Sequence, residues 1–522
     1  MLDFKEEICY HITRKQGNKE TRKQGNKETL VNYNFFSYIN CCFLIFCLSL
    51  PSFCFGILNA TTQNVINGNL PYLTFNDGIT REFSPNALGL LRITLPDGTS
   101  LIPTEHDAYP DSIVDTSKAE SPIIIESTDT FENIKTYVPF PADGNDNYPK
   151  IDFDQLVVAP YNYWQDDDGD ELVPSNLSEI KGALQVTWKD NHGRDISSKV
   201  KSNPKTKPSP CDAPYSLTVE LKKGVIKTKY GKPSQLTIDD NSHVYYFYPK
   251  VEEPIFCYAQ PNLTFGDGQY AGPAEQWDPM NGFKLQNINN PQSNFPTVGS
   301  NNLFFKLIVD GITAAEIISS NGSIIQPESG EGVTLELTPE NNQPQGKVVR
   351  VTLHGLTDSA PNGSFSPSTF KIFANKNGNN KLLYNFTINR WFIAHLSSSS
   401  WNGASRYCPN LASSPKWRVP DSADYSNGTG YATRKIAWDN TNQSRNKMGG
   451  LMNEWGNLYT DYYAGSEWEG DSHHTGVWAT EYTGGAGNYS SHNAANRDNG
   501  RIDWHYDWDW YGGKIAVACV TP

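Results

Sequence analysis

The sequence lacks most of the features by which enzymes and membrane proteins are recognised. Its 522 residues contain no Gly-x-Ser-x-Gly, His-Glu-x-x-His or phosphate-loop motif, and no Cys-x-x-Cys or Cys/His spacing typical of a metal site. After residue 60 no apolar run is long enough to span a bilayer. Long helices with a periodic apolar face are also hard to find. These absences argue against a helical membrane protein and a zinc-binding domain, and we do not expect an enzyme.

Positive charge is also scarce. The chain has 43 lysines and arginines against 57 aspartates and glutamates, which gives a formal net charge of -14. Without residues 1–60, which hold 7 basic and 5 acidic side chains, 36 basic and 52 acidic residues remain and the charge is -16. A surface this acidic argues against nucleic acid and against anionic membranes as partners.

What the sequence does have is β-strand character. With 41 glycines, 33 prolines and 37% hydrophobic residues, it suits a β-rich, loop-rich extracellular protein of two to four domains. In "KVVRVTLHGL" every second residue is apolar, and "FKIFANKNGNNKLLYNFTINRWFIA" predicts a hairpin with residues 377–379 at its tip. "WKDNHGRDI" predicts a strand, a turn at 191–193 and a second strand. Seven or so strands within 278–395 predict an immunoglobulin-like sandwich.

The first 60 residues differ from the rest. Residues 13–20 read "TRKQGNKE" and residues 21–28 repeat them, a polar stretch that we interpret as disordered or as lying before the true start. The apolar segment "FFSYINCCFLIFCLSLPSFCFGILNA" resembles the h-region of a secretory signal, with Ala60 or Gly56 as the small residue at the cleavage site. We expect a cleaved signal, with an uncleaved membrane anchor as the alternative.

Cysteine usage supports export. Five of the nine cysteines precede residue 61, and four remain: Cys211, Cys257, Cys408 and Cys519. An even number in an exported chain predicts two disulfides. Three pairings are possible, and the separation of the two clusters along the chain favours Cys211–Cys257 and Cys408–Cys519.

The composition changes after residue 395. Ten of the thirteen tryptophans fall between Trp391 and Trp510. "SSSSWNGASRYCPNL" predicts a short helix, because a serine can cap it and apolar residues recur at helical spacing. This Trp-x-x-Ala-x-x-Tyr-Cys helix, an Arg-Val-Pro turn and a last strand ending in "AVACV" resemble the C-type-lectin-like fold. In that fold a disulfide ties the first helix to the last strand, which implies Cys408–Cys519 here.

A more specific resemblance covers about residues 278–522. Six ordered pieces are similar to the C-terminal region of enterobacterial adhesins of the intimin/invasin family: "SNFPTVGSNNLFFKLIVDG", "YNFTINRWFIA", "WRVPDSADYSN", "GGLMNEWGNLY", "GVWATEY" and "AVACVTP". The resemblance implies a recognition module, and it covers residues 61–277 only loosely. Members of the family carry an outer-membrane β-barrel before these domains, and this sequence shows neither barrel-length strands nor room for one.

Aromatic and acidic residues alternate near the C-terminus, in "IDWHYDWDW". A strand with this pattern places its rings on one face and its acids on the other. The rings either belong to the core, with the acids in water, or partly face a ligand, because flat rings stack on sugars and aromatic surfaces. The candidate ligand-binding residues of this stretch are Trp504, Tyr506, Trp508, Trp510, Asp507 and Asp509.

The segment "NEWGNLYTDYY" adds Tyr462 and Tyr463 as candidates for the binding face, whereas we expect Trp455 in the core. Calcium-dependent sugar binding needs acid–amide pairs that chelate the ion and the sugar together. No Glu-Pro-Asn or Trp-Asn-Asp stands at the expected place, and "WDN" at 438–440 has the wrong order. We therefore expect no calcium-dependent lectin activity.

The loop "QDDDGDEL" gathers acidic side chains in the N-terminal half. Alternate Asp oxygens on a tight loop can wrap Ca²⁺, so Asp166, Asp168 and Asp170 are candidate metal ligands. The EF-hand template fails, because Gly169 is misplaced and Leu177 stands where the bidentate Glu should be. The alternative interpretation is an acidic surface turn, and we expect no cofactor other than Ca²⁺.

Together these observations predict a mainly β protein whose immunoglobulin-like β-sandwich modules precede a C-terminal α+β, C-type-lectin-like domain. The expected segments are 1–60 (repeat and signal), 61–155 (β-rich), 156–277 (sandwich-like, with a disulfide), 278–395 (immunoglobulin-like) and 396–522 (lectin-like). We expect contact with a membrane only through the N-terminal segment.

The predicted function is adhesion: an exported bacterial protein, secreted or held at the cell surface, that recognises a host-cell protein or glycan without catalysis. One alternative is a secreted glycan-active enzyme, which would need a pocket with convergent carboxylates of shifted pKa. The other is a structural subunit of a surface assembly, which would have a fully packed tip. The oligomeric state and the ligand do not follow from the sequence.

Overall fold

The computed structural model describes residues 68–522 with gaps, all within one unit of contacts, Ile66–Pro522. The expected repeat and signal segment, together with Trp508, Asp509 and Trp510, lies outside the described residues. None of the described helices has both the length and the apolar character needed to cross a bilayer. The gaps are residues 77, 83–86, 106, 108, 173–178, 265, 268–270, 427–449, 460, 470–475, 485–489 and 508–514.

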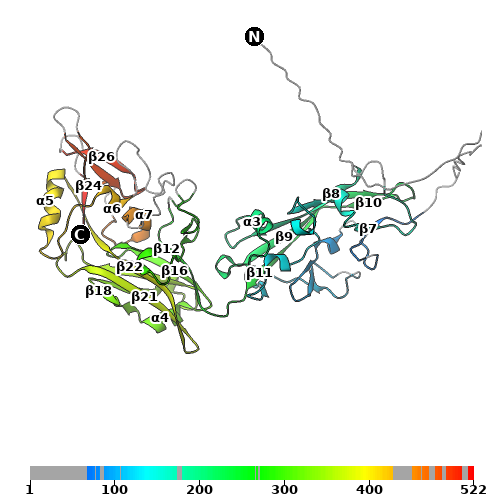
Figure 1. The fold of residues 1–522 in the computed structure, drawn as a ribbon, viewed down its shortest axis with the longest axis horizontal. Helices are drawn as coiled ribbons and strands as arrows, with labels where there is room; N and C mark the ends of the chain where they lie inside the picture. The colour runs from blue at the N-terminus through cyan, green and yellow to red at the C-terminus, as the bar shows by residue number, and fades with distance from the viewer. Residues whose placement is uncertain are drawn as a thin grey trace, which may run out of the picture. The chain divides into compact units, whose positions relative to one another are not determined.

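The N-terminal half of the described chain surrounds one hydrophobic core, here called the first core, whose buried members run from Leu73 to Phe247. Its main sheet has the strand order β5-β11-β9-β8-β6, with β10 also pairing with β9, and the sheets β1-β7 and β2-β3-β4 complete it. Figure 1 labels β8, β9, β10 and β11 of the main sheet. The elements are β1 Tyr72–Leu73, η1 Leu88–Leu91, β2 Ile93–Thr94, β3 Ser100–Ile102, β4 Ile113–Val114, β5 Ile123–Ile125, η2 Phe131–Asn133, η3 Pro141–Asp143, β6 Lys150–Asp152, α2 Phe153–Leu156, β7 Trp164–Gln165, β8 Lys181–Lys189, α3 Ser197–Ser202, η5 Pro210–Asp212, β9 Tyr215–Lys227, β10 Gln235–Ile238 and β11 Asn241–Pro249.

Strand pairing carries the first core across the boundary expected between residues 155 and 156. β6 pairs with β8, and β5 pairs in parallel with β11. The structure therefore joins, in one core, segments that the sequence divides. The next strand, β12 (Ile255–Gln260), instead pairs with β16 (Phe304–Asp310) of the following core, although the sequence groups it with 156–277.

The remaining residues share a second core, whose buried members run from Ala259 to Val520. Around it lie a seven-stranded sheet, β13-β14-β12-β16-β20-β19-β17, a three-stranded sheet, β18-β21-β22, and a six-stranded sheet, β15-β23-β27-β24-β25-β26. The further elements are β13 Trp277–Asp278, β14 Gly282–Phe283, η7 Pro291–Ser293, β15 Val298–Ser300, α4 Ala314–Asn321, β17 Ile324–Ile325, β18 Ser329–Glu331, β19 Val333–Pro339, η8 Glu340–Asn342, β20 Val348–Gly355, β21 Ser366–Lys376, β22 Asn379–Ile388, β23 Arg390–Ser399, α5 Trp401–Leu411, α6 Ser422–Tyr425, α7 Leu451–Trp455, η12 Asp461–Tyr463, β24 Gly476–Tyr482, β25 Ser491–Asn496, β26 Ile502–Tyr506 and β27 Ile515–Val520.

Local sequence signals determine several of these elements as predicted. In β20 the alternate residues Val349, Val351 and Leu353 are buried. The hairpin β21–β22 turns at Asn377-Gly378, both of which have the positive φ that a two-residue turn requires. Helix α5 begins after Ser400, whose side chain accepts a hydrogen bond from the N–H of Gly403. The mainly β class of the chain is confirmed.

The stretch "WKDNHGRDI" forms the predicted turn but not the second strand. The Asp190 side chain accepts the N–H groups of His192 and Arg194, which closes the turn after β8. The Asp195 side chain then accepts the N–H of Ser197, and helix α3 follows. The return strand is reduced to a single antiparallel bridge between Lys189 and Asp195, with the N–H of Ile196 donating to the carbonyl of Trp188. The aspartates satisfy the backbone locally and favour a helix start over a longer ladder.

The C-terminal sheet begins inside the segment expected to be immunoglobulin-like. Strand β23 crosses the boundary expected between residues 395 and 396, and it pairs with β15 on one side and β27 on the other. Helix α5 packs against β23 and β27, α6 against β24 and β25, and α7 against β15. Figure 1 labels the three helices together with β24 and β26. The two expected domains therefore share strands as well as a core.

Candidate functional site

Strands β24, β25 and β26 present the side chains of the best candidate site. In the antiparallel register, His492 of β25 lies opposite His505 of β26, and Asn493 lies opposite Trp504. Residues directly opposite one another point to the same face of a sheet. The two histidines therefore share one face, while Trp504 and Tyr506 share the other, as the alternation of the sequence predicts.

On the histidine face four aromatic side chains form what we call the ring cluster: Trp401, Trp478, Tyr482 and His492. Trp401 of α5 stacks on His492, with ring centroids 3.9 Å apart and planes 18° apart. Trp478 is fully buried beneath them and donates its indole N–H to the carbonyl of Ser399 over 2.8 Å. Tyr482 meets the edge of His492 at 5.5 Å and is 63% exposed.

Asp507 holds the histidine of the ring cluster. Its Oδ1 lies 2.8 Å from Nδ1 of His492, and its N–H donates to the carbonyl of Ser490. Asp507 is only 8% exposed, so the expectation of a solvated acid is wrong for this residue. Asp507 follows His505 by two residues, so the alternation of β26 places its carboxylate on the histidine face. A buried, hydrogen-bonded carboxylate fixes the orientation of the imidazole, which in turn fixes Trp401.

Trp504 and Tyr506 lie on the opposite face of β26, with their rings edge to face at 4.7 Å. Both are half-buried, so neither a pure core role nor a free surface role describes them. The other candidates of this stretch, Trp508, Asp509 and Trp510, lie outside the described residues.

Tyr462 and Tyr463 lie elsewhere, against the seven-stranded sheet. Tyr463 is fully buried, donates its hydroxyl to the carbonyl of Trp455 and accepts the N–H of Asn262. Tyr462 is half-buried and stacks on Phe304 at 5.0 Å. Trp455 is fully buried, as expected. These contacts give the two tyrosines a packing role between the seven-stranded and C-terminal sheets.

A second group of polar side chains, the Glu467 cluster, joins the two sheets. It consists of Asp358, His395, Tyr407 and Glu467. The Glu467 carboxylate accepts the backbone N–H groups of Asp358 at 2.5 Å and Ala394 at 3.4 Å. Burial raises the pKa of Glu467 to about 7. Sequence reasoning missed this cluster, because its members come from four separate segments with no shared motif.

Asp358 organises the rest of the Glu467 cluster. Its Oδ2 lies 2.7 Å from Nδ1 of His395, and its Oδ1 accepts the hydroxyl of Tyr407. The rings of His395 and Tyr407 stack at 4.4 Å. Two carboxyl groups, an imidazole and a phenol thus lie together where β23, α5 and two loops meet.

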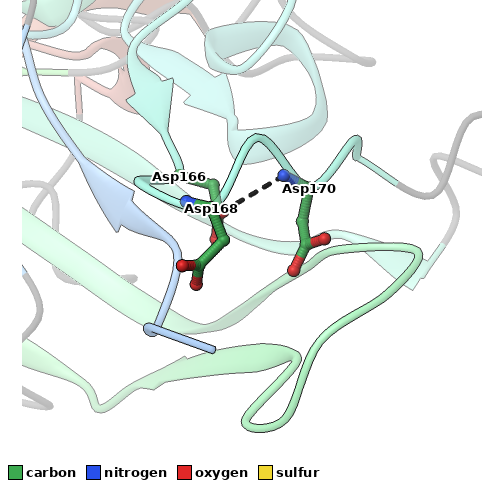
Figure 2. A group of neighbouring side chains, drawn as sticks. All are labelled: Asp166, Asp168 and Asp170. Carbon is green, nitrogen blue, oxygen red and sulfur yellow. Dashed lines mark hydrogen bonds between the residues drawn. The ribbon is translucent and has the colours of Figure 1, made fainter. Parts of the chain in front are cut away.

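The three candidate metal ligands of the first core do come together. Figure 2 shows Asp166, Asp168 and Asp170 on one loop, and one carboxylate oxygen of each lies within 4.8 Å of the others. Asp166 Oδ1 accepts the N–H groups of Asp168 and Asp170. Asp168 accepts hydrogen bonds from the backbone and side chain of Asn69. Lost hydration and the neighbouring carboxylates of Asp166 and Asp168 raise the pKa of Asp170. These hydrogen bonds set the loop conformation, and they leave Asp166 Oδ2 buried without a hydrogen-bond partner among the described residues.

Both favoured disulfides are present. Cys408 of α5 is bonded to Cys519 of β27, across 111 residues of sequence. Cys211 of η5 is bonded to Cys257 of β12, across 46 residues, and this bond links the first core to the seven-stranded sheet of the second. It therefore joins two cores, whereas the sequence places it inside one domain.

Comparison with known proteins gives one distant likeness. No protein-family model matches the chain, and no curated protein matches it. Among solved structures, the chain is similar to invasin, described as a bacterial integrin-binding protein, with 15% identity and a TM-score of 0.29. The match covers 66% of this chain and 52% of that one, so it spans about half the length of the invasin structure. A likeness at this TM-score defines neither the fold nor the function of this chain.

Proposed function

We propose that the chain is an exported, adhesin-like bacterial protein that binds a host-cell surface protein or glycan through its C-terminal region, without catalysis. The observation that carries this function is the ring cluster. Tyr482 is exposed next to the stacked rings of Trp401 and His492, and Asp507 fixes the His492 ring through a contact with its Nδ1. Rigid aromatic side chains give a ligand contact area at low entropic cost, which is how recognition surfaces are commonly built.

The architecture that we propose around this surface is an immunoglobulin-like sandwich followed by a C-type-lectin-like domain. The seven-stranded and three-stranded sheets on the second core support the sandwich. The Cys408–Cys519 bond between the first helix and the last strand of the C-terminal sheet supports the lectin-like domain. The ordered motifs that resemble those of the intimin/invasin family support both.

Export, to the cell surface or into the medium, is supported by the two disulfides. Disulfides persist in oxidising compartments and are rare in the bacterial cytosol. A host surface protein is a partner of the same broad kind as the integrin for which invasin is described. The acidic composition supports neither nucleic acid nor a membrane as partner.

The proposed function is tested by screening the purified exported chain against host-cell surface proteins and a glycan array. The wild type is compared with Tyr482→Ser, with Trp504→Ala and with a control, Tyr230→Ser, because Tyr230 is a similarly exposed tyrosine (57%) far away in the sequence, just after β9. A ligand whose binding Tyr482→Ser abolishes and Tyr230→Ser preserves supports the site. Binding that is lost only in Trp504→Ala would move the site to the other face of β26.

The Glu467 cluster favours a second candidate, a secreted glycan-active enzyme. A half-buried carboxyl group with a pKa of about 7 has the protonation behaviour of a general acid or base. A glycan panel incubated with wild type and Glu467→Gln decides between the two. Hydrolysis that disappears in Glu467→Gln would identify an enzyme, whereas glycan or protein binding with no turnover supports adhesion. Absence of any ligand in both assays would favour a structural subunit.

A further inference from the structure

A cleft of about 510 Å³ lies where the first core meets the seven-stranded sheet of the second. Its floor is aromatic, with Phe131 and Tyr215 from the first core edge to face at 5.4 Å, and with Tyr258 from β12. Its walls carry Lys199 of α3, Lys207 and, from the second core, Lys284. We call it the lysine cleft. Clefts of this size bury small ligands in other proteins.

A β-bulge builds one wall of the lysine cleft. The pairing of β12 with β16 shifts register between Phe256 and Tyr258, so Cys257 is an extra residue in the strand. A bulge re-aims side chains that strict alternation would separate. Here Cys257 bonds to Cys211, and the hydroxyl of Tyr258 donates to Asp212 Oδ1 over 2.8 Å. Two adjacent residues of one strand therefore engage the same turn of the first core.

Arg194 holds the opposite wall. Its Nε donates to Asp190 at 2.6 Å, and its Nη1 donates to Asp278 of the second core at 2.8 Å. Beside it, His192 Nε2 lies 2.7 Å from Asn281 Oδ1. The covalent and polar contacts on both sides keep the lysine cleft open as a fixed feature of the junction.

The acidic side chains of the lysine cleft have hydrogen-bond or ion-pair partners, whereas two of its lysines have no ion pair in the part of the chain that the structure describes. Asp190 and Asp278 share Arg194, Asp212 accepts from Tyr258, and Asp195 accepts the N–H of Ser197. By contrast, no ion pair among the described residues includes Lys199 or Lys207, and both are exposed. They belong to the segment "SSKVKSNPKTKPSP", residues 197–210, which has four lysines and no acid in a chain of net charge -14. The lining as a whole has four acidic and four basic side chains, but its acids already have partners, whereas Lys199 and Lys207 have no ion pair with any residue the structure describes. These two lysines point to an anionic ligand.

We propose that the lysine cleft binds an acidic saccharide, a sugar unit that bears a carboxylate or sulfate group. The three rings are 4–6% exposed, so they give the floor an apolar edge that a sugar ring can contact, and the lysines offer partners for the anionic substituent. A long polyanion such as nucleic acid fits poorly, because outside the cleft it would meet a surface with an excess of acidic groups. The site is separate from the ring cluster and does not depend on it.

The test uses the full exported chain in calorimetric titrations with 3′-sialyllactose, with a heparin tetrasaccharide and with neutral lactose. We expect at least one acidic probe to bind and lactose to bind far more weakly, with affinity falling as NaCl rises from ~20 to ~500 mM. The two acidic probes distinguish a carboxylate-bearing from a sulfate-bearing source of the ligand. Failure of both acidic probes to bind at about 10 mM would overturn the proposal.

Two matched double variants decide whether the cleft itself is the site. Lys199→Gln/Lys207→Gln and Lys201→Gln/Lys205→Gln each remove two charges from the same segment, but only the first pair lines the cleft. We expect the first to weaken binding about tenfold and the second to stay within about twofold. Equal losses would show a diffuse charge effect and refute the cleft. Tyr482→Ser should leave the binding of the acidic saccharide unchanged. The test of the lysine cleft is therefore independent of the test of the proposed adhesion site.

Discussion

The disulfide between Cys211 and Cys257 should contribute a large share of the stability of the first core. The 46-residue separation encloses β9, β10 and β11, three strands of the first sheet. A cross-link that closes such a loop removes conformational freedom mainly from the unfolded chain. For a loop of this length the chain-entropy relation gives about 4 kcal/mol at 25 °C.

The perturbation is the double variant Cys211→Ala/Cys257→Ala. The bonds of Tyr258 to Asp212 and of Arg194 to Asp278 remain, so the junction keeps its geometry while the constraint is removed. Urea unfolding followed by circular dichroism measures the effect, and the midpoint and the slope are compared with those of the oxidised wild type. We expect the free energy of unfolding of the first transition to fall by about 3–4 kcal/mol.

Pulling single molecules from their two ends gives a second readout. In the wild type the disulfide shields the residues between Cys211 and Cys257 from tension, so they add no length on unfolding. In the double variant those residues add about 150–165 Å of contour length, at 3.3–3.6 Å per residue. An unchanged urea midpoint together with an unchanged contour length would refute the reasoning, because it would mean that the bond constrains nothing.

Three further predictions follow from single groups. Because the folded-state pKa of Glu467 is raised to about 7, its contribution to stability is complete below about pH 4.5 and is lost as the pH rises through 7. In Glu467→Gln the free energy of unfolding, measured with urea, should no longer fall over this pH range. The loss removed is about 1–2 kcal/mol after allowance for solvent exposure. A variant whose free energy of unfolding depends on pH as the wild type's does would contradict the prediction. Arg194→Ala leaves the Asp190 carboxylate, 3% exposed, without its cation, and should cost about 2–4 kcal/mol in a thermal or urea melt; a loss below ~0.5 kcal/mol would show that the pair is solvated. Calorimetry should show no Ca²⁺ binding at the Asp166 loop, because three carboxylates supply fewer than the roughly six to eight oxygen ligands that Ca²⁺ takes. Heat that disappears in Asp168→Asn would identify a calcium site.

Local features of the fold could be predicted from the sequence, since neighbouring residues determine them. The start of α5 depends on Ser400, and the β21–β22 turn depends on Asn377-Gly378. The disulfide pairing followed from the separation of two cysteine clusters. Each of these depends on a capping group, a turn conformation or chain spacing that a short stretch of sequence contains.

The division into domains could not be predicted from short stretches of sequence. The parallel pairing of β15 with β23 and of β5 with β11 connects segments about ninety or more residues apart. No local pattern specifies which distant strand a given strand will join. The sequence also gives no signal for the bulge at Cys257, the residue whose disulfide joins the two cores.

In the candidate site, too, the local features could be predicted from the sequence and the contacts between distant segments could not. Alternation correctly placed Trp504 and His505 on opposite faces of one strand. It also places Asp507 on the histidine face, but it could not show that this carboxylate pairs with His492 of the neighbouring strand, or that Trp401 of a distant helix stacks there. Tyr463 looked like a surface ring beside other aromatics, but its hydroxyl finds two backbone partners in the interior, which makes burial favourable.

The most direct test of the central claim is the binding of fluorescently labelled exported chain to host epithelial cells, measured for wild type, Tyr482→Ser and Tyr230→Ser at equal concentration. If the ring cluster is the recognition surface, wild type and Tyr230→Ser bind alike and Tyr482→Ser loses at least about 90% of the signal while melting at the wild-type temperature. Equal binding by all three proteins would contradict the claim that Tyr482 and its ring cluster recognise the host.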